Sequence, residues 1–285
     1  MLISMKRLLL SLLALLPFAV QAQYVEMGII GGAMTYSGDL AEVAYRIEHT
    51  HPSAYGFVQY NTNPYFSMRW QGGYGRISGS DENSSRSYAN LRNLSFTSDI
   101  YEGSMLFIWN ITGFDAKRLR QRFSPYVFAG VSAFKFNPRA YFQGQWVELQ
   151  PLGTEGQGTN AYPERDPYGL TQVGLPMGGG MRFALAEHWT LGIEIKFTKT
   201  WTDYLDDVSS TYVAQEILIA ENGILSYNLS NRTGEYLNTE PLDWDETVQR
   251  GDPTDKDWFI MTGITVSRNL IRGPRGGKQV RCPTF

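Results

Sequence analysis

Hydrophobic and polar residues alternate one by one along most of the chain, and this pattern predicts β-strands. Trp189–Tyr204 shows it most clearly: apolar side chains occupy the odd positions from 189 to 197, and Thr, Gly, Glu and Lys occupy the even ones. Because successive strand residues point to opposite faces, one face is apolar and the other polar. Eight segments share the alternation: Tyr24–Ser37, Ser53–Asn61, Pro64–Ser78, Leu94–Ile111, Ser124–Asn137, Thr171–Ala186, Trp189–Tyr204 and Trp258–Leu270.

The lengths of the connections alternate as well. The short ones are Asn61–Pro64 and Ala186–Trp189, and the long ones are Asp39–Pro52, Gly79–Asn93, Pro138–Leu170 and Leu205–Asp257. Outer-membrane barrels have short periplasmic turns and longer outer loops. We therefore predict an all-β fold: a transmembrane antiparallel up-and-down β-barrel of eight strands, with long outer loops and both termini in the periplasm.

Two other architectures fit parts of the pattern. The last loop is long enough for an extra hairpin, which would give ten strands, although Ala214–Gly223 has the pattern of a short helix with an Asn-Gly stop. A soluble β-sandwich or a lipocalin-like barrel also has period-two strands. The aromatic strand ends and the alternating loop lengths favour the membrane barrel.

The N-terminus has the form of a secretory signal peptide. Lys6 and Arg7 precede an apolar run, Leu8–Val20, which is too short to span a bilayer and is followed by a small-x-small site at Val20–Ala22. No Cys lies directly after the run, so a lipoprotein is not expected. The predicted divisions are a signal peptide at 1–22, a barrel at 23–271 and a basic periplasmic tail at 272–285.

Composition agrees with a bacterial outer-membrane protein. Aromatic residues make up 14% of the chain and charged residues only 19%, and the net charge of −3 gives no support for a nucleic-acid surface. The single cysteine, Cys282, excludes an intramolecular disulfide and a cysteine metal cluster. A closed, fully hydrogen-bonded barrel in lipid is the expected source of stability.

The first strand is rich in glycine. The alternation directs Met27 and Ile29 to lipid and Glu26 and Ile30 to the interior. Gly28, Gly31 and Gly32 are expected to relieve crowding inside a narrow barrel or to let it bend. Tyr36 is expected at the outer rim, before a turn at Ser37-Gly38-Asp39.

The same alternation predicts charges inside the barrel. The inward residues are Glu26, Arg69, Glu102, Arg182, Glu194 and Lys196, with Lys135 as an uncertain seventh. Acids and bases nearly balance, and buried charges need partners. We therefore predict structural charge pairs that plug the lumen, with Arg69 pairing an inward acid such as Glu102. A proton or ion path is the alternative.

The sequence predicts no enzyme, no catalytic residue, no cofactor and no metal site. His49 and His51 fall on the outer side and His188 falls in a periplasmic turn, so the three are not expected to converge. Asp203, Asp206 and Asp207 cluster at the outer end of the seventh strand. They could form a cation site, or, as we predict, a solvated acidic rim or loop clamp.

Several stretches together resemble the PorG-like family, an outer-membrane β-barrel component of the type IX secretion system. They are GGAMTYSGDL, NLSFTSDIYE, SPYVFAGVSAFKFNP, ELQPLGTEGQG, LPMGGGMRFAL, TDYLDDVSSTYV, RGDPTDKDWFIMTGITVS and the terminal CPTF. The resemblance implies a non-enzymatic subunit that anchors or organises a periplasmic ring of the PorK lipoprotein and PorN at the outer membrane. The alternatives are a stand-alone small barrel acting as a narrow pore or surface-binding protein, and a membrane-embedded hydrolase.

If that resemblance holds, basic periplasmic segments are candidates for contact with the ring. One lies in the turn Phe114–Phe123 and the other in the tail, where Pro274 and Gly276-Gly277 forbid regular structure. The candidate partner-binding residues are Lys117, Arg118, Arg120, Arg122, Arg272, Arg275, Lys278, Arg281 and Cys282.

Overall fold

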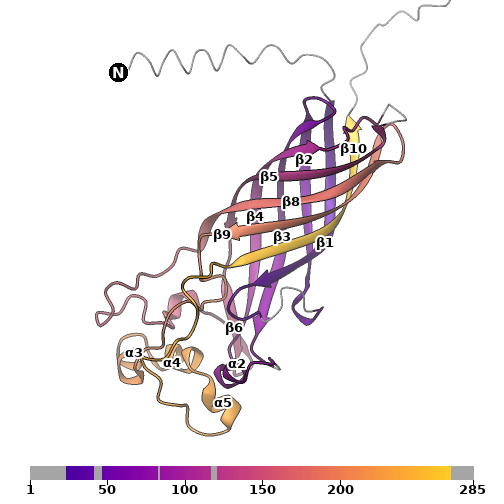
Figure 1. The fold of residues 1–285 in the computed structure, drawn as a ribbon. Coiled ribbons are helices and arrows are strands. Elements are labelled where there is room, and N and C mark those ends of the chain that lie inside the picture. Colours follow the sequence, from indigo (N-terminus) through magenta and orange to yellow (C-terminus); the bar gives the residue numbers. More distant parts are fainter. Residues whose placement is uncertain (1–23, 42–46, 83, 117–120, 271–285) are drawn as a thin grey trace, which may run out of the picture.

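The fold is a closed antiparallel β-barrel, seen in a computed structural model that describes residues 24–41, 47–82, 84–116 and 121–270 (Figure 1). Its eight strands are β1 (Tyr24–Ser37), β2 (His51–Asn61), β3 (Phe66–Ser80), β4 (Ser95–Asn110), β5 (Phe123–Lys135), β8 (Thr171–Ala184), β9 (Trp189–Thr200) and β10 (Trp258–Leu270). Each strand pairs with the next, β1 pairs with β10, and the β3–β4 pairing completes the ring. The predicted eight-stranded architecture is confirmed.

Side chains alternate between the two faces of the wall as a membrane barrel requires. In β4, Tyr101, Met105 and Trp109 are exposed, whereas Leu106 and Ile108 are buried inside. In β1, Met27 and Ile29 face outward and Glu26 and Ile30 face inward, as predicted. No helix among the described residues is long and apolar enough to cross a membrane.

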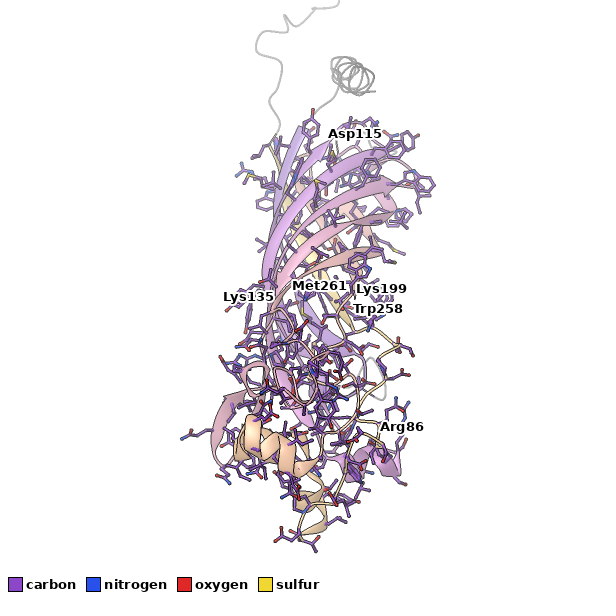
Figure 2. All side chains as sticks on the ribbon, turned by 90° about the vertical axis from the view of Figure 1, so that its left-hand side faces the viewer. Arg86, Asp115, Lys135, Lys199, Trp258 and Met261 are labelled. Carbon is purple, nitrogen blue, oxygen red and sulfur yellow. The ribbon has the colours of Figure 1, made fainter. Side chains whose placement is uncertain are left out.

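Exposed and half-buried aromatic residues form a girdle at each end of the cylinder. One girdle lies at the end with the short turns, called the turn end, and comprises Phe66, Trp109, Phe123, Phe183 and Trp189. The other lies towards the opposite end and comprises Tyr74, Tyr101, Trp201 and Trp258, with Lys135 and Lys199 at a similar level (Figure 2). Aromatic rings and long basic side chains are typical of the two membrane–water interfaces.

The long connections form a folded cap beyond the second girdle (Figure 1). The cap is defined as the described residues of 38–50, 81–94, 136–170 and 201–257. Its elements are η2 (Ile47–His49), α2 (Ser87–Arg92), β6 (Pro138–Phe142), β7 (Gln145–Glu148), η4 (Gln150–Leu152), α3 (Gln215–Glu221), α4 (Ile224–Ser230) and α5 (Thr233–Leu237).

The cap departs from the predictions in three ways. The helix expected at Ala214–Gly223 is present as α3, but α4 and α5 follow it and no hairpin lies in that part of the loop. The extra hairpin, β6–β7, instead extends β4 outside the barrel, through pairing of Thr97 with Arg139. The strand predicted to reach Tyr204 ends at Thr200, whose hydroxyl donates to the Thr202 carbonyl as the chain turns into the cap.

The largest hydrophobic core lies where the strands run into the cap. It includes Tyr36, Phe96, Phe136, Leu205 and Phe259, all nearly or fully buried. The Tyr36 and Phe96 rings meet edge to face with centroids 4.9 Å apart, a favourable aromatic geometry. Tyr36 therefore lies at the outer end of β1, as predicted, and it is buried there in the core beneath the cap.

The glycines of β1 do not share one role. A Cβ on Gly32 would lie 2.1 Å from the Thr262 carbonyl oxygen of β10, so only glycine allows this approach. A Cβ on Gly31 would meet nothing within 4 Å. The predicted relief of crowding therefore applies to Gly32 and not to Gly31.

A closed barrel predicts a characteristic behaviour on electrophoresis. The folded protein should resist SDS at room temperature, because all its strands are paired, and it should migrate faster unboiled than boiled. The experiment is semi-native electrophoresis of outer-membrane fractions. A single band position regardless of heating, with recovery in the soluble fraction, would contradict a membrane barrel.

Candidate functional site

The barrel interior holds three ionic groups, and the first joins β3, β5 and β9. The Arg69 guanidinium lies 2.7 Å from a Glu194 carboxylate oxygen, and its Nε donates to the Gln59 amide oxygen at 2.9 Å. The Tyr126 hydroxyl donates to the same Glu194 oxygen at 2.7 Å. The Phe57 ring centroid lies 4.4 Å from the guanidinium carbon, close enough for a cation–π contact. Every hydrogen-bonding partner in this group is buried.

The second group joins β9 to β4 and β2. The Lys196 ammonium lies 2.6 Å from a Glu102 oxygen, and the Tyr55 hydroxyl donates to that oxygen at 2.9 Å. The ammonium also lies 4.2 Å from the Tyr55 ring centroid. Lys196 is fully buried, so this one acid and one ring replace its hydration.

The third group lies towards the turn end. Arg182 is 3.6 Å from Glu26, and its guanidinium carbon sits 3.8 Å from the centre of the Phe114 ring. The Ser267 hydroxyl and the Asn61 amide also donate to Glu26. The Glu26 carboxylate thus accepts hydrogen bonds from β2 and β10 and lies beside a cation from β8.

Together these groups place six of the seven predicted interior charges inside the barrel, three acids against three bases. Two details differ from the predictions. Arg69 contacts Glu194 rather than Glu102, whose partner is Lys196. Lys135 is exposed on the outer face, because Phe134 and Phe136 take the inward positions on either side of it.

The neutral members of the network were not predicted from the sequence. Tyr55 and Gln59 follow the inward phase of β2, and Tyr126 follows that of β5. Their alternation was readable in the sequence, but their hydrogen-bond partners lie on strands far away in the chain and could not be identified from it.

A second buried polar cluster fixes the cap to β1. The Tyr36 hydroxyl lies 2.6 Å from an Asp206 oxygen and 2.9 Å from an Asp257 oxygen. The Leu205 amide donates to the other Asp257 oxygen at 2.9 Å. A Cβ on Gly38 would lie 2.1 Å from the Tyr36 hydroxyl, so glycine is required for this closure. This explains why a glycine interrupts the chain directly after β1.

The Tyr36 cluster has more acceptors than protons. A phenol has one proton to donate, so both contacts are hydrogen bonds only when one carboxyl group is protonated. Burial raises the pKa of Asp206 and of Asp257 well above the usual range, and repulsion from the Asp206 charge raises that of Asp257 further. The contact geometry and the direction of both pKa shifts therefore favour a proton shared within this cluster.

Glu155 and Arg250 form the centre of the cap. The Arg250 guanidinium lies 2.9 Å from a Glu155 oxygen and 3.7 Å from an Asp207 oxygen. The Ser209 and Ser210 amides donate to Glu155 at 2.9 and 3.0 Å. Residues from two long connections, 136–170 and 201–257, are thereby held together by one buried acid.

Asp207 is more weakly compensated than Glu155. It accepts hydrogen bonds from the Thr154 and Tyr168 hydroxyls at 2.5 and 2.6 Å. Burial nevertheless raises its pKa to about 6, because the nearest cation, Arg250, lies closer to Glu155. Burial likewise raises the pKa of Asp203 to about 6, and its carboxylate accepts the Ser209 hydroxyl.

The three clustered aspartates are therefore a loop clamp rather than a solvated rim. Asp203, Asp206 and Asp207 are almost fully buried and point into separate networks. Among the residues the structure describes, no group of three or more His, Cys, Asp or Glu side chains is arranged to hold a metal ion.

Another ion pair connects the cap loop 81–94. The Arg92 guanidinium binds both oxygens of Asp81, at 2.7 and 2.8 Å, and donates to the Asp39 carbonyl at 3.0 Å. It also donates to the Arg250 carbonyl. Such bidentate pairs fix geometry, so three connections meet at Arg92.

Two histidines converge, contrary to the prediction. His49 Nδ1 and His51 Nε2 lie 3.2 and 2.7 Å from the Ser78 hydroxyl. The Asp99 carboxylate of the neighbouring strand is held instead by Tyr74, Arg76 and Arg139. His188 lies in a turn at the other end of the barrel.

Most candidate partner-binding residues fall outside the described part of the chain. These are Lys117, Arg118, Arg120, Arg272, Arg275, Lys278, Arg281 and Cys282, and the predicted signal peptide also lies there. Arg122 is described: it lies half-buried at the turn end, directly before β5, and its carbonyl accepts the Ala184 amide at 2.8 Å.

These features define a small outer-membrane β-barrel protein with a charge-filled interior and a folded cap. A family model, "Domain of unknown function (DUF6089)", matches residues 6–222, and the chain belongs to this family. Among curated proteins, none matches the chain in sequence.

Solved outer-membrane barrels are similar to the chain at low identity. Neisserial surface protein A is 12% identical, with a TM-score of 0.41, over 87% of this chain and 99% of that one. The attachment invasion locus protein Ail of Yersinia pestis is 9% identical, with a TM-score of 0.38, over 87% and 97%. OprG from Pseudomonas aeruginosa is 10% identical, with a TM-score of 0.37, over 86% and 95%. The architecture described above rests on the strand pairing of the chain itself.

The interior pairs predict a specific mutational pattern. Arg69→Leu leaves the buried Glu194 charge uncompensated and should lower the free energy of unfolding by about 3–5 kcal/mol. Adding Glu194→Leu should restore part of the lost free energy of unfolding, because the unpaired buried carboxylate is then removed. Urea unfolding in micelles, followed by tryptophan fluorescence, measures both. The matched control is Arg69→Leu combined with Glu102→Leu. In this double variant the loss of unfolding free energy should equal or exceed the sum of the two single losses. If the losses of unfolding free energy for Arg69→Leu and Glu194→Leu simply add in the double variant, the two residues do not pair.

The cap acids predict a pH dependence. The folded cap favours protonated Asp207, so this contribution to stability is complete below the ordinary pKa of 3.8 and is lost as the pH rises through about 6. A shift of this size corresponds to about 3 kcal/mol. Hydrogen exchange of cap amides, corrected for intrinsic rates, should therefore show more protection at pH 5 than at pH 8.

Asp207→Asn should remove part of this dependence, because an amide does not titrate. Asp255→Asn, which changes an exposed aspartate of the same connection, is the matched control and should leave it intact. Cap protection that increases from pH 5 to pH 8 in the unmodified protein would contradict the raised pKa.

Proposed function

We propose that this protein is a sealed, non-enzymatic outer-membrane barrel that works through its surfaces rather than by transport. The observation that carries the proposal is the interior, where three buried ion-pair groups and their tyrosines occupy the lumen. An eight-stranded barrel has room for little more than its own side chains. A permeating ion would have to break pairs whose charges have no water to replace their partners.

In the proposed orientation, the cap faces outward and both termini face the periplasm. The short connections between β2 and β3 and between β8 and β9 support it, because the cap-end connections are far longer. The cap is then the surface presented to the cell exterior. Its buried Glu155–Arg250 pair gives that surface a fixed shape.

A more specific proposal is a scaffold role in the type IX secretion system, with the PorK lipoprotein and PorN as periplasmic partners. Its support is the sequence resemblance to PorG-like proteins. Two of the resembling stretches, 148–158 and 202–213, supply Glu155 and Asp207 to the centre of the cap. The motifs thus coincide with residues that hold this cap together. A stand-alone surface-binding barrel is the competing function.

The sealed lumen predicts the absence of large conductance. Purified full-length protein in planar bilayers should give no steady channel steps. Exchange of the inward charges for alanines, as in the combined Arg69→Ala and Glu194→Ala variant, should instead admit small ions if the variant retains its heat-modifiable migration. Steady open-channel currents from the unmodified protein would refute the proposal.

The secretion role predicts loss of association from the periplasmic side. Deleting residues 272–285 and neutralising Lys117, Arg118, Arg120 and Arg122 should leave the barrel folded but reduce co-purification of the ring and export of type IX cargo. The expected reason is loss of weak, salt-sensitive contacts. Lys135→Gln with Lys199→Gln, which neutralises two basic residues at the opposite end of the barrel, is the control for position. Unchanged ring association and export would exclude this docking surface.

A further inference from the structure

A groove in the cap has the composition of a sugar-binding site. It lies between the β6–β7 hairpin and the segment that contains α4 and α5, and it has a volume of about 610 Å³. This is within the range of ligand pockets, about 300–1,000 Å³. Its lining includes Tyr141, Gln143, Asn228, Arg232, Glu235 and Thr239.

An uncovered aromatic pair lies at the groove: Tyr141 lines it, and Trp146 packs against Tyr141. Tyr141 and Trp146 are cross-strand partners in the β6–β7 hairpin, and their rings meet at 5.3 Å in an edge-to-face arrangement. They are 52% and 57% exposed. Large aromatic side chains left in water on a rigid hairpin provide flat apolar surfaces for a ligand.

These rings lie away from the membrane. Tyr101 belongs to the aromatic girdle, and Thr97, which pairs with Arg139 at the base of the hairpin, precedes it by four residues on the cap side of β4. Four strand residues extend about 13 Å. The hairpin continues beyond that point, so the pair faces the aqueous side of the cap and not the lipid.

The opposite wall of the groove is polar and fixed. Two nitrogens of Arg232 bind Glu235, at 2.7 and 3.1 Å, and a third donates to the Ser95 hydroxyl at 3.0 Å. Asn228 of α4, on this wall, and Gln143, in the turn of the β6–β7 hairpin, have side-chain amides with no hydrogen-bond partner among the described residues. Each offers two donors and an acceptor oxygen. Glu235 already compensates the guanidinium charge, so the groove has no unpaired positive charge that would favour an anionic ligand.

We propose that this groove binds a neutral oligosaccharide. A pyranose ring has one face of C–H groups, which suits Tyr141 and Trp146, and an edge of hydroxyls that both donate and accept, which suits Asn228 and Gln143. The compensated Arg232–Glu235 pair adds planar hydrogen-bonding groups without net charge. The proposal deepens the surface-binding role proposed above, and it depends on that role only for the location of the ligand outside the cell.

The test uses purified full-length protein in amine-oxide micelles, because alkyl glycoside detergents would themselves offer sugars. The probes are maltoheptaose, cellohexaose and mannohexaose, with heparin as the anionic comparison, and the readout is titration calorimetry. At least one neutral probe should bind, and heparin should not bind more tightly. Tyr141→Ala and Trp146→Ala should each weaken binding about three- to tenfold.

Tyr65→Ala is the matched control, since Tyr65 is 45% exposed at the turn end of the barrel. It should bind as the unmodified protein does. Absence of binding by all three neutral probes up to their solubility limits, equal binding by Tyr141→Ala, or binding of heparin alone would each overturn the proposal. Because binding is measured on isolated protein, its failure is separate from a failure of the sealed-barrel function, which conductance tests.

Discussion

The need to neutralise charge inside a narrow barrel is the constraint on which this structure depends. Eight strands enclose no bulk water, so each buried carboxylate needs a cation within reach. Glu194 and Glu102 meet this need with Arg69 and Lys196, and a tyrosine hydroxyl donates to the same oxygen of each acid. These contacts cross the lumen between strands that are not neighbours. They therefore hold the barrel in one register, and they leave the outer surfaces as the place where such a protein can act.

The charge balance of the cap differs from that of the lumen. Acidic and basic side chains are equal in number in the lumen, whereas in the cap several buried aspartates lie near few cations. Glu155 takes the closest contact with Arg250, and the aspartates rely on hydroxyls and backbone amides. The pKa values of these aspartates are raised because they are buried and the nearby cation lies closer to Glu155. The same networks tie all the long connections into one body, and that body is rigid enough to present the Tyr141 and Trp146 pair in a defined position.

The sequence was informative wherever one strand could be considered alone. Strand alternation predicted the bounds of β1 and β10 and the inward direction of Arg69. It could not assign Glu194 as the partner of Arg69, because that choice depends on which strands face each other across the lumen. Lys135 was uncertain for a related reason: it lies at a strand end, where the phase is defined by few residues.

The cap was less predictable, because its contacts join residues far apart in the chain. Glu155 and Arg250 are separated by 95 residues, and neither stands out in its local sequence. The β6–β7 hairpin was missed because it is short and pairs only with the end of β4. The convergence of His49 and His51 on Ser78 was missed because it depends on the alignment of two neighbouring strands.

The central claim is that the interior charge pairs, and not the cap, close the barrel. The most direct test is the conductance of a barrel in which residues 207–249 are replaced by a short Gly-Ser linker, with heat-modifiable migration as the check that it has folded. This folded barrel, which lacks most of the longest cap connection, is expected to remain closed to small ions in planar bilayers. Steady ion currents through it would show that the cap is the seal, and would contradict the account.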